Sequence, residues 1–382
     1  MHLAHFDIAL FLRDYWQKKP LLIRNPWDQW ENPLEPDELA GLACEEDVES
    51  RLITQTGAKW ALEHGPIAET RFAKLGKAQW TLMVQAVDQA VPDVAALIEP
   101  FRFVPNWRID DVMVTYAADE GGVGPHFDQY DVFLIQGLGK RRWQVGPLCD
   151  SETPLMPHAD LRLLADFQVT DEWVLEPGDI LYVPPRFAHN GVAVGTDCMT
   201  YSVGFRAPSR YDLIEGYSEH LLEEVLDEDR YADPDLAVQD NPGEISAAAI
   251  DRLHAMIMAK MGDRAAFARW FGQYNSASKY PDLDFRPEEP VEIEDIQALL
   301  AEGAWIERNP ASRFSFVRQG EGALVLFVDG ESFDCSGEAA LIAERMCAQE
   351  QLVADPDLAA SQTVTALIAG LINQGSVTVE LP

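Results

Sequence analysis

The sequence predicts an α+β protein in which a β-rich centre is followed by a helical region and a small mixed domain. Between Trp107 and about Phe205, short extended runs punctuated by Gly and Pro are typical of a β-sandwich or barrel. From about Tyr211 to Tyr280, apolar residues recur at helical spacing. Beyond the Pro-rich segment 281–290, helices and strands follow in an order that suits a small α+β domain of winged-helix type. We therefore expect three regions, with the bounds 1–208, 209–285 and 291–382.

The expected elements follow from apolar periodicity and from the residues that interrupt it. In the first hundred residues these are a helix around 11–16, a strand at 21–23, a helix from Pro36 and an amphipathic helix at 80–91. In the centre they are strands at 112–116, 132–135, 143–145, 180–183 and 199–205. In the tail they are helices at 291–302, 339–348 and 359–373 and strands at 312–318, 323–328 and 376–381.

The helical region contains one continuous apolar stripe. Ile250, Leu253, Ile257 and Met261 recur at helical spacing and would share one face of a helix. Such a stripe is more often part of a core than an interface, although the pattern allows either.

The charge of the chain excludes several classes of partner. The 29 Lys and Arg residues stand against 64 Asp and Glu, which leaves a formal net charge of −35. Such a surface repels phosphate backbones and anionic membranes and is compatible with a basic partner. The tail has few basic residues, so we expect no direct DNA binding despite its winged-helix-like order.

Cysteine use and hydropathy favour the cytoplasm. The five cysteines are scattered, odd in number and without CxxC spacing, which is typical of free thiols in a reducing compartment. The N-terminal apolar stretch contains charges and does not resemble a signal peptide. No run of 18 apolar residues is present, so we expect no membrane-spanning segment.

A candidate metal site lies in the β-rich centre. His126 and Asp128 belong to GPHFD and, two residues apart in a strand, would point to one face. His189 follows LEPGDILYVPP, a turn, a strand and a proline-stiffened exit. Two imidazoles and one carboxylate form the ligand set of non-haem Fe(II) oxygenases and leave open positions for a bidentate 2-oxoacid and O2. An isolated HxD is often a chance pair, and the downstream His189 element is what favours the metal site.

A 2-oxoglutarate co-substrate would need a cation, and GKRRWQV offers three. Strand alternation places Arg141 with Trp143 and Val145, and the two apolar residues mark the interior face. Arg141 is thus the expected inward cation, whose planar fork suits a carboxylate, unless it only forms a structural ion pair. Thr115 on the preceding strand would add a hydroxyl to the same carboxylate, or would be an ordinary strand threonine.

With these residues in view, the chain resembles the JmjC-type ribosomal oxygenases, in particular their bacterial arginine-hydroxylating branch. The resemblance is carried by FLRDYWQKKPLLIRN, WRIDDVMVTYAADEGGVGPHFDQYDVFLIQGLGKRRWQVG, LEPGDILYVPPRFAHNGVA and MTYSVGFRAPS. It implies a double-stranded β-helix (cupin-like) JmjC core, a helical dimerisation region giving a homodimer, and a C-terminal winged-helix-like domain. The tail resembles the family in element order more than in residues.

The resemblance also implies a reaction. Fe(II) would be held at His126, Asp128 and His189, and 2-oxoglutarate by Arg141 and Thr115. With O2 as the second co-substrate, the implied reaction is 3-hydroxylation of an arginine in large-subunit ribosomal protein number sixteen. A guanidinium substrate requires acceptors near the metal. The candidates are Asp110, Asp111, Asp119, Tyr130 and Asp131, of which Asp119, Tyr130 and Asp131 are the preferred substrate-binding residues.

Two rival interpretations stay open. The same oxygenase chemistry would serve on a histidine, on another protein side chain or on a methylated lysine. A cupin-fold scaffold would bind metal without turnover, and the complete triad together with Arg141 speaks against it.

Overall fold

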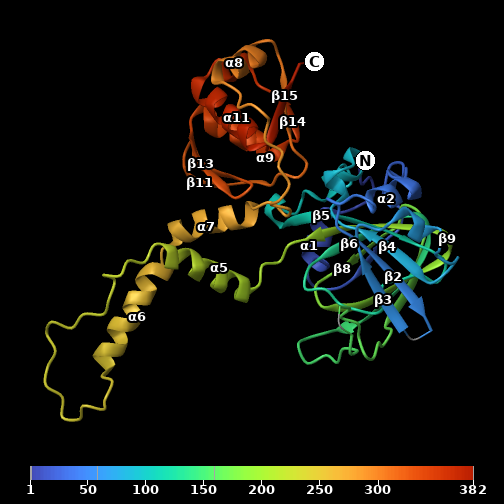
Figure 1. The fold of residues 1–382 in the computed structure, drawn as a ribbon, viewed down its shortest axis with the longest axis horizontal. Helices are drawn as coiled ribbons and strands as arrows, with labels where there is room; N and C mark the ends of the chain where they lie inside the picture. Colours follow the sequence, from blue (N-terminus) through green and yellow to red (C-terminus); the bar gives the residue numbers. More distant parts are fainter. Residues whose placement is uncertain (1, 58, 159, 382) are drawn as a thin grey trace. The chain divides into compact units, whose positions relative to one another are not determined.

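The computed structural model describes residues 2–57, 59–158 and 160–381 and confirms the α+β class. Contacts divide the chain into two compact units, Met1–Ala207 and Pro208–Pro382. The first unit is the β-rich centre with the N-terminal hundred residues (Figure 1, blue to green). The predicted helical region and the predicted C-terminal domain both lie within the second unit.

One antiparallel sheet dominates the described part of the first unit. Its nine strands run in the order β1-β8-β6-β9-β5-β4-β2-β3, with β7 beside β6. The strands are β1 Leu21–Ile23, β2 Ser50–Thr56, β3 Lys59–His64, β4 Trp80–Val84, β5 Ile109–Ala117, β6 Val132–Leu148, β7 Asp171–Leu175, β8 Ile180–Val183 and β9 Phe187–Phe205. Side chains of β2, β4, β5, β6 and β9 line one cavity, so the sheet curls around an interior, as a cupin-like core requires.

Short helices flank this sheet. The α-helices are α1 Ile8–Asp14, α2 Pro36–Leu42, α3 Glu69–Phe72 and α4 Pro92–Ala95, and the 3₁₀ turns are η1 Val87–Gln89, η2 Glu99–Phe101 and η3 Asn106–Arg108. The predicted helix near residue 11, the strand at 21–23 and the helix from Pro36 are confirmed.

One prediction about the secondary structure of this unit was wrong, and two of the predicted strands are parts of one longer strand. The segment 80–91 is a strand and a 3₁₀ turn, because β4 pairs with both β2 and β5 and its alternating Leu82 and Val84 are buried. The runs at 132–135 and 143–145 belong to the single 17-residue strand β6. Register shifts around Gly139, whose φ is +60°, let this strand bend without ending.

The two faces of β6 have different surroundings. Phe133 and Ile135 are fully buried in an aromatic cluster that includes Phe11, Tyr182 and Phe205. Val132 and Leu134, on the other face of the strand, line the internal cavity. The face that carries Phe133 is therefore the outer core face, and the alternate residues point into the barrel.

The second unit contains helices and two small sheets (Figure 1, yellow to red). The helices are α5 Arg210–Glu223, α6 Ala247–Met261, α7 Arg264–Ser276, α8 Ile293–Ala301, α9 Glu338–Ala348, α10 Pro356–Ala359 and α11 Gln362–Gln374. The strands are β10 Trp305–Arg308, β11 Phe314–Gly320, β12 Ala323–Val328, β13 Glu331–Ser336, β14 Gln351–Val353 and β15 Val377–Glu380, paired as β14-β10-β15 and β11-β12-β13. The predicted tail elements are all present, and the short strands β10, β13 and β14 were not predicted.

Helix α6 exposes the apolar stripe. Ile250 is 51 %, Leu253 43 % and Ile257 60 % exposed, and no residue of the helix is buried. The stripe is therefore not part of a core within this chain. No described helix combines the length and the apolar character needed to cross a membrane.

Candidate active site

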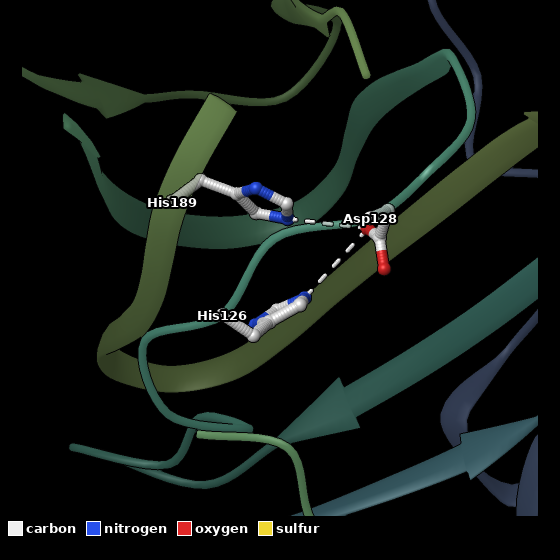
Figure 2. Close-up of side chains that lie close together, drawn as sticks. All are labelled: His126, Asp128 and His189. Atoms are coloured by element: carbon white, nitrogen blue, oxygen red, sulfur yellow. Dashed lines mark ion pairs between the residues drawn. The ribbon is translucent and has the colours of Figure 1, made fainter. Parts of the chain in front are cut away.

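His126, Asp128 and His189 converge at one end of the barrel. One ligand atom from each residue lies within 4.8 Å of the others. Figure 2 shows both imidazoles directed at the Asp128 carboxylate. Gly124, with a φ of +84°, turns the chain just before His126, and His189 lies near the start of β9. The HxD pair and the distant His189, combined by the sequence argument, are thus neighbours in the fold.

Backbone carbonyls set the tautomer of both histidines. Nδ1 of His126 is 2.9 Å from the carbonyl oxygen of Gly124, and Nδ1 of His189 is 3.0 Å from that of Phe187. Because a carbonyl oxygen only accepts, each Nδ1 carries the proton and each Nε2 presents a lone pair. These Nε2 atoms lie 3.8 Å (His126) and 3.5 Å (His189) from Oδ2 of Asp128.

Electrostatics keep His189 neutral. Its side chain is almost fully buried, and burial, followed by the neighbouring His126, lowers its pKa to about 4. A neutral imidazole with a free Nε2 is ready to bind a metal at pH 7 without first losing a proton. The donor set of two nitrogens and one oxygen fits a divalent transition metal and leaves coordination positions for other ligands.

Arg141 is the inward cation that alternation predicts. It is 3 % exposed, whereas its neighbours Lys140 and Arg142 are exposed. One guanidinium nitrogen donates to the hydroxyls of Thr115 and Thr200, both at 3.1 Å. The structure therefore brings Arg141 and Thr115 together, as the sequence predicts.

The Arg141 guanidinium lacks a negative partner in the described residues. No carboxylate there acts on it electrostatically, and its Nε finds no acceptor. Burial lowers its pKa, which is the direction expected of a cation held away from water. A buried charge with only neutral partners is costly, and a bound anion would remove that cost. The surroundings of Arg141 thus fit a carboxylate ligand.

A cavity of about 450 Å³ joins the triad to Arg141. All three triad residues line it, as do Arg141 and Thr115. Its apolar walls include Met83, Met113, Leu134 and Trp143. One cavity therefore holds the candidate metal ligands and a buried cation, which is the arrangement required for a ligand that spans both.

Acidic and phenolic groups also line this cavity. Asp110, Asp111 and Tyr130 are among its lining residues. The side-chain amide of Gln85 donates to both Asp111 oxygens, at 3.0 and 2.8 Å, which orients this 3 %-exposed carboxylate. The pKa of Tyr130 is raised, first by loss of solvation and then by the hydrogen-bonded Asp128, although the residue is 43 % exposed. Tyr130 therefore stays protonated beside Asp128.

Asp131 and Asp119 do not line the cavity. Asp131 is fully buried on the opposite face of β6, where it accepts hydrogen bonds from Tyr182 at 2.6 Å, Gln17 at 2.9 Å and Arg108 at 3.2 Å. Asp119 accepts a hydrogen bond from the amide of Gly195 at 2.7 Å. Strand alternation places Asp131 on the same face as Phe133 without deciding which face is inside, and the structure shows that this face belongs to the outer core.

Sequence reasoning missed Thr200 and the polar atom of Trp143. The hydroxyl of Thr200 accepts a hydrogen bond from the guanidinium of Arg141. The sequence signal that could have identified it is the extended run MTYSVGF, in which Thr200 lies two residues before the cavity-lining Ser202. Trp143 served only as an apolar marker of the inner face, yet its indole nitrogen is buried and has no acceptor among the described residues.

Known proteins resemble this chain along nearly its whole length. The JmjC domain family matches residues 96–213, and the ROXA-like winged helix family matches residues 257–378. A ribosomal protein uL16 3-hydroxylase from Escherichia coli is 38 % identical over 96 % of this chain and 95 % of its own length. A probable ribosomal oxygenase from Haemophilus influenzae is 35 % identical over 86 % of this chain and 83 % of its own length.

Solved structures show the same fold. The Escherichia coli ribosomal oxygenase YcfD in complex with cobalt and 2-oxoglutarate matches with a TM-score of 0.88 at 35 % identity, covering 100 % of both chains. Another structure of that protein matches with a TM-score of 0.90 at the same identity and coverage. Sequence and structure agree over the catalytic core and the winged helix alike. This chain therefore belongs to the family of JmjC-domain ribosomal oxygenases.

Proposed function

We propose that this protein is an Fe(II)- and 2-oxoglutarate-dependent oxygenase that 3-hydroxylates an arginine of ribosomal protein uL16 in the cytoplasm. The observation that carries the proposal is the convergence of His126, Asp128 and His189 on the cavity that also holds buried Arg141. The 38 % identity to a uL16 3-hydroxylase over 96 % of the chain directs the choice of substrate.

His126, Asp128 and His189 would hold the iron. Bound Fe(II) with O2 and 2-oxoglutarate supplies oxidative decarboxylation to succinate and CO2, with transfer of one oxygen atom to a C–H bond. The chain's own contribution is orientation, because the carbonyls of Gly124 and Phe187 keep both Nε2 lone pairs directed at the metal position.

Arg141 would bind the distal carboxylate of 2-oxoglutarate. Its guanidinium has a fixed planar fork, and the hydroxyls of Thr115 and Thr200 hold one nitrogen in place. The same hydroxyls could donate to the carboxylate once it is bound. This arrangement favours a dicarboxylate that reaches from Arg141 to the metal over a monocarboxylate.

The substrate guanidinium would meet the acidic part of the cavity. Asp110, Asp111 and Tyr130 line it near Asp128, and the Coulombic effect of these carboxylates on Tyr130 indicates their proximity. A planar guanidinium is recognised well by carboxylates and by a phenolic oxygen. We propose these three groups as substrate-binding residues in place of Asp119 and Asp131.

The decisive experiment combines purified protein, Fe(II), 2-oxoglutarate and free uL16. We expect succinate formation and a one-oxygen mass gain that tandem mass spectrometry assigns to C3 of an arginine. An Asp128→Ala variant should give neither, whereas His64→Ala, which changes an exposed histidine of β3, should retain both. Oxygen gain on a histidine or another side chain would overturn the choice of substrate. Absence of succinate with every candidate protein substrate would favour the interpretation as a metal-binding scaffold without turnover.

We also propose that the protein is a homodimer in which two copies of α6 cover each other. The helix exposes Ile250, Leu253, Ile257 and Met261 on one face, and apolar stripes of this extent are usually covered. A second copy is the proposed occupant because the described residues of this chain bury no part of α6.

A further inference from the structure

Gln85 connects a cation and a carboxylate that both line the active-site cavity. One guanidinium nitrogen of Arg51 donates to the side-chain oxygen of Gln85 at 3.0 Å. The side-chain nitrogen of Gln85 donates to the two carboxylate oxygens of Asp111 at 3.0 and 2.8 Å. All three residues line the cavity that holds the candidate metal ligands. The amide of Gln85 therefore lies between the two charged groups and contacts both.

The two partners of Gln85 leave its amide a single orientation. A guanidinium can only donate, so the amide oxygen must face Arg51. An ionised carboxylate can only accept, so the NH2 group must face Asp111. Arg51 therefore determines which end of the amide is presented to Asp111.

The backbone around Gln85 is held on both sides. Its N–H donates to the carbonyl of Glu49 at 2.9 Å, which extends the pairing of β4 with β2 by one residue. Three residues further along, a carboxylate oxygen of Asp88 accepts a hydrogen bond at 2.7 Å from the N–H of Val112, the neighbour of Asp111 in β5. The side chain of Gln85 therefore starts from a fixed position beside the carboxylate that it contacts.

The amide holds Asp111 without adding a positive charge to it. Arg51 contacts the oxygen of Gln85 and lies 3.7 Å from the carboxylate of Glu49. A direct contact between Arg51 and Asp111 would instead form an ion pair, which would compete with the guanidinium of a substrate for the same oxygens. An amide is a donor with no net charge, so it can orient a carboxylate and leave its charge in place.

We propose that Gln85, whose amide is oriented by Arg51, is a positioning residue that fixes Asp111 for the guanidinium of the substrate arginine. The directions of the two Asp111 oxygens then decide how the planar fork is held and which carbon of the side chain lies at the metal position. This inference rests on the proposed function, because it requires an arginine side chain to meet Asp111 in the cavity.

A Gln85→Met variant keeps the length of the side chain and removes the amide. With the full chain, Fe(II), 2-oxoglutarate and a uL16 peptide that contains the arginine, the KM for the peptide should rise about tenfold, as expected for a lost hydrogen bond to a charged group. Less hydroxylated peptide should form per succinate, because a misplaced side chain is not held at the metal position. The KM for 2-oxoglutarate should stay within about twofold, since Gln85 does not contact Arg141.

The matched control is Gln144→Met. Gln144 of β6 also lies between a donor and a carboxylate, accepting from Asn190 at 3.3 Å and donating to Glu172 at 2.6 Å, but it does not line the cavity. This variant should keep the KM for the peptide and the yield of product per succinate within about twofold of the unchanged protein.

Two further variants separate positioning from charge and from general stability. Gln85→Glu keeps the shape and adds a negative charge but loses the donor, so its KM for the peptide should lie above that of the unchanged protein. A KM below it would show that the charge of the cavity, not the orientation of Asp111, governs binding. In an Asp111→Asn background, Gln85→Met should change the KM by no more than about twofold, because the residue through which it acts is already altered.

The outcomes distinguish this inference from the proposed function. If the unchanged protein hydroxylates the arginine and Gln85→Met has the same KM for the peptide, the inference is wrong while the proposed function stands. A Gln85→Met effect that persists in full in the Asp111→Asn background would also overturn the inference. If the unchanged protein does not hydroxylate arginine, both are wrong.

Discussion

His126 and His189 are joined by an antiparallel bridge of two backbone hydrogen bonds. The amide of His126 donates to the carbonyl of His189 at 3.0 Å, and the amide of His189 donates to the carbonyl of His126 at 2.8 Å. The ring centres lie 4.3 Å apart as a result. The backbone therefore positions two of the three candidate metal ligands, and we expect the site to be formed before metal binds.

A preformed site predicts that metal stabilises the folded protein without being needed for folding. At a Co(II) concentration about 100 times its Kd, metal binding should raise the free energy of unfolding by about 2.7 kcal/mol. For a unit of this size that corresponds to roughly 5–10 °C in Tm. Thermal unfolding with and without Co(II) measures it. Asp128→Ala should fold and lose the shift, and His64→Ala should keep it. A metal-free protein that is unfolded would contradict the prediction.

Arg141→Met should raise the KM for 2-oxoglutarate strongly. Removing a charged hydrogen-bond donor costs about 1.5–3 kcal/mol, or roughly 10- to 150-fold. The KM of Arg141→Lys should lie between those of the unchanged protein and of Arg141→Met. Lysine keeps the positive charge but lacks the planar fork that meets Thr115 and Thr200. Arg142→Met changes the exposed neighbour on the outer face and is the matched control. Succinate formation at varied 2-oxoglutarate measures all three, and equal effects at both positions would refute the assignment of Arg141.

Asp131 should matter for stability rather than for substrate binding. Asp131→Ala leaves the buried Tyr182 hydroxyl, the half-buried Arg108 guanidinium and the Gln17 amide without their shared acceptor, and we expect a loss of about 3–5 kcal/mol in the free energy of unfolding. Chemical denaturation measures it. A matched change of the solvent-exposed Asp235 should cost less than about 0.5 kcal/mol.

The pH dependence of stability should report Asp131 as well. Burial raises its folded-state pKa, partly offset by hydrogen bonds from Gln17 and Tyr182. The folded state therefore binds this proton more readily than the unfolded state, so the Asp131 contribution decreases as pH rises from the unfolded value through the folded pKa. The stability of the unchanged protein relative to Asp131→Asn should thus improve as pH falls toward about 4. A difference that is constant with pH would contradict this.

The net charge of −35 should accelerate encounter with a basic substrate. We expect kcat/KM for free uL16 to fall as salt shortens the Debye length from about 30 Å at 0.01 M to about 8 Å at 0.15 M. Because RNA repels this surface, rRNA-covered uL16 should react more slowly than free uL16. Turnover of a short peptide with little net charge should vary less with salt. Equal activity on assembled ribosomes would count against this role of the charge.

The proposed α6 interface predicts a change of oligomeric state. Ile257→Glu places a charge in the centre of the exposed stripe and should convert dimers to monomers in sedimentation experiments. Ala259→Glu places the same charge about 200° away around the helix and should leave the dimer intact. A monomeric unchanged protein, or equal effects of both variants, would exclude this interface.

Much of the site could be predicted because it depends on strand alternation and on a compact motif. The spacing of His126 and Asp128, and the apolar Trp143 and Val145 beside Arg141, specify relative directions without any tertiary contact. Together with the resemblance to known oxygenases, they were enough to identify the triad and the inward cation.

Tertiary structure decided which of two equivalent faces is inside. Asp131 and Tyr130 are adjacent and chemically plausible, yet only Tyr130 lines the cavity, because packing of Phe133 against Phe11 and Tyr182 makes the Asp131 face the outer core. Alternation is a local property of a strand, whereas the inner face is set by non-local packing.

The contrast between local pattern and non-local packing also explains where else the structure differs from the sequence predictions. By itself the sequence determined the class of fold, the charge, the candidate ligand set and the inward direction of Arg141. Only the fold decided that 80–84 is a strand, that the α6 stripe is exposed, and that Thr200 joins Thr115 beside Arg141. Each of these depends on partners far away in the chain, and a local pattern carries no information about which distant segment will supply them.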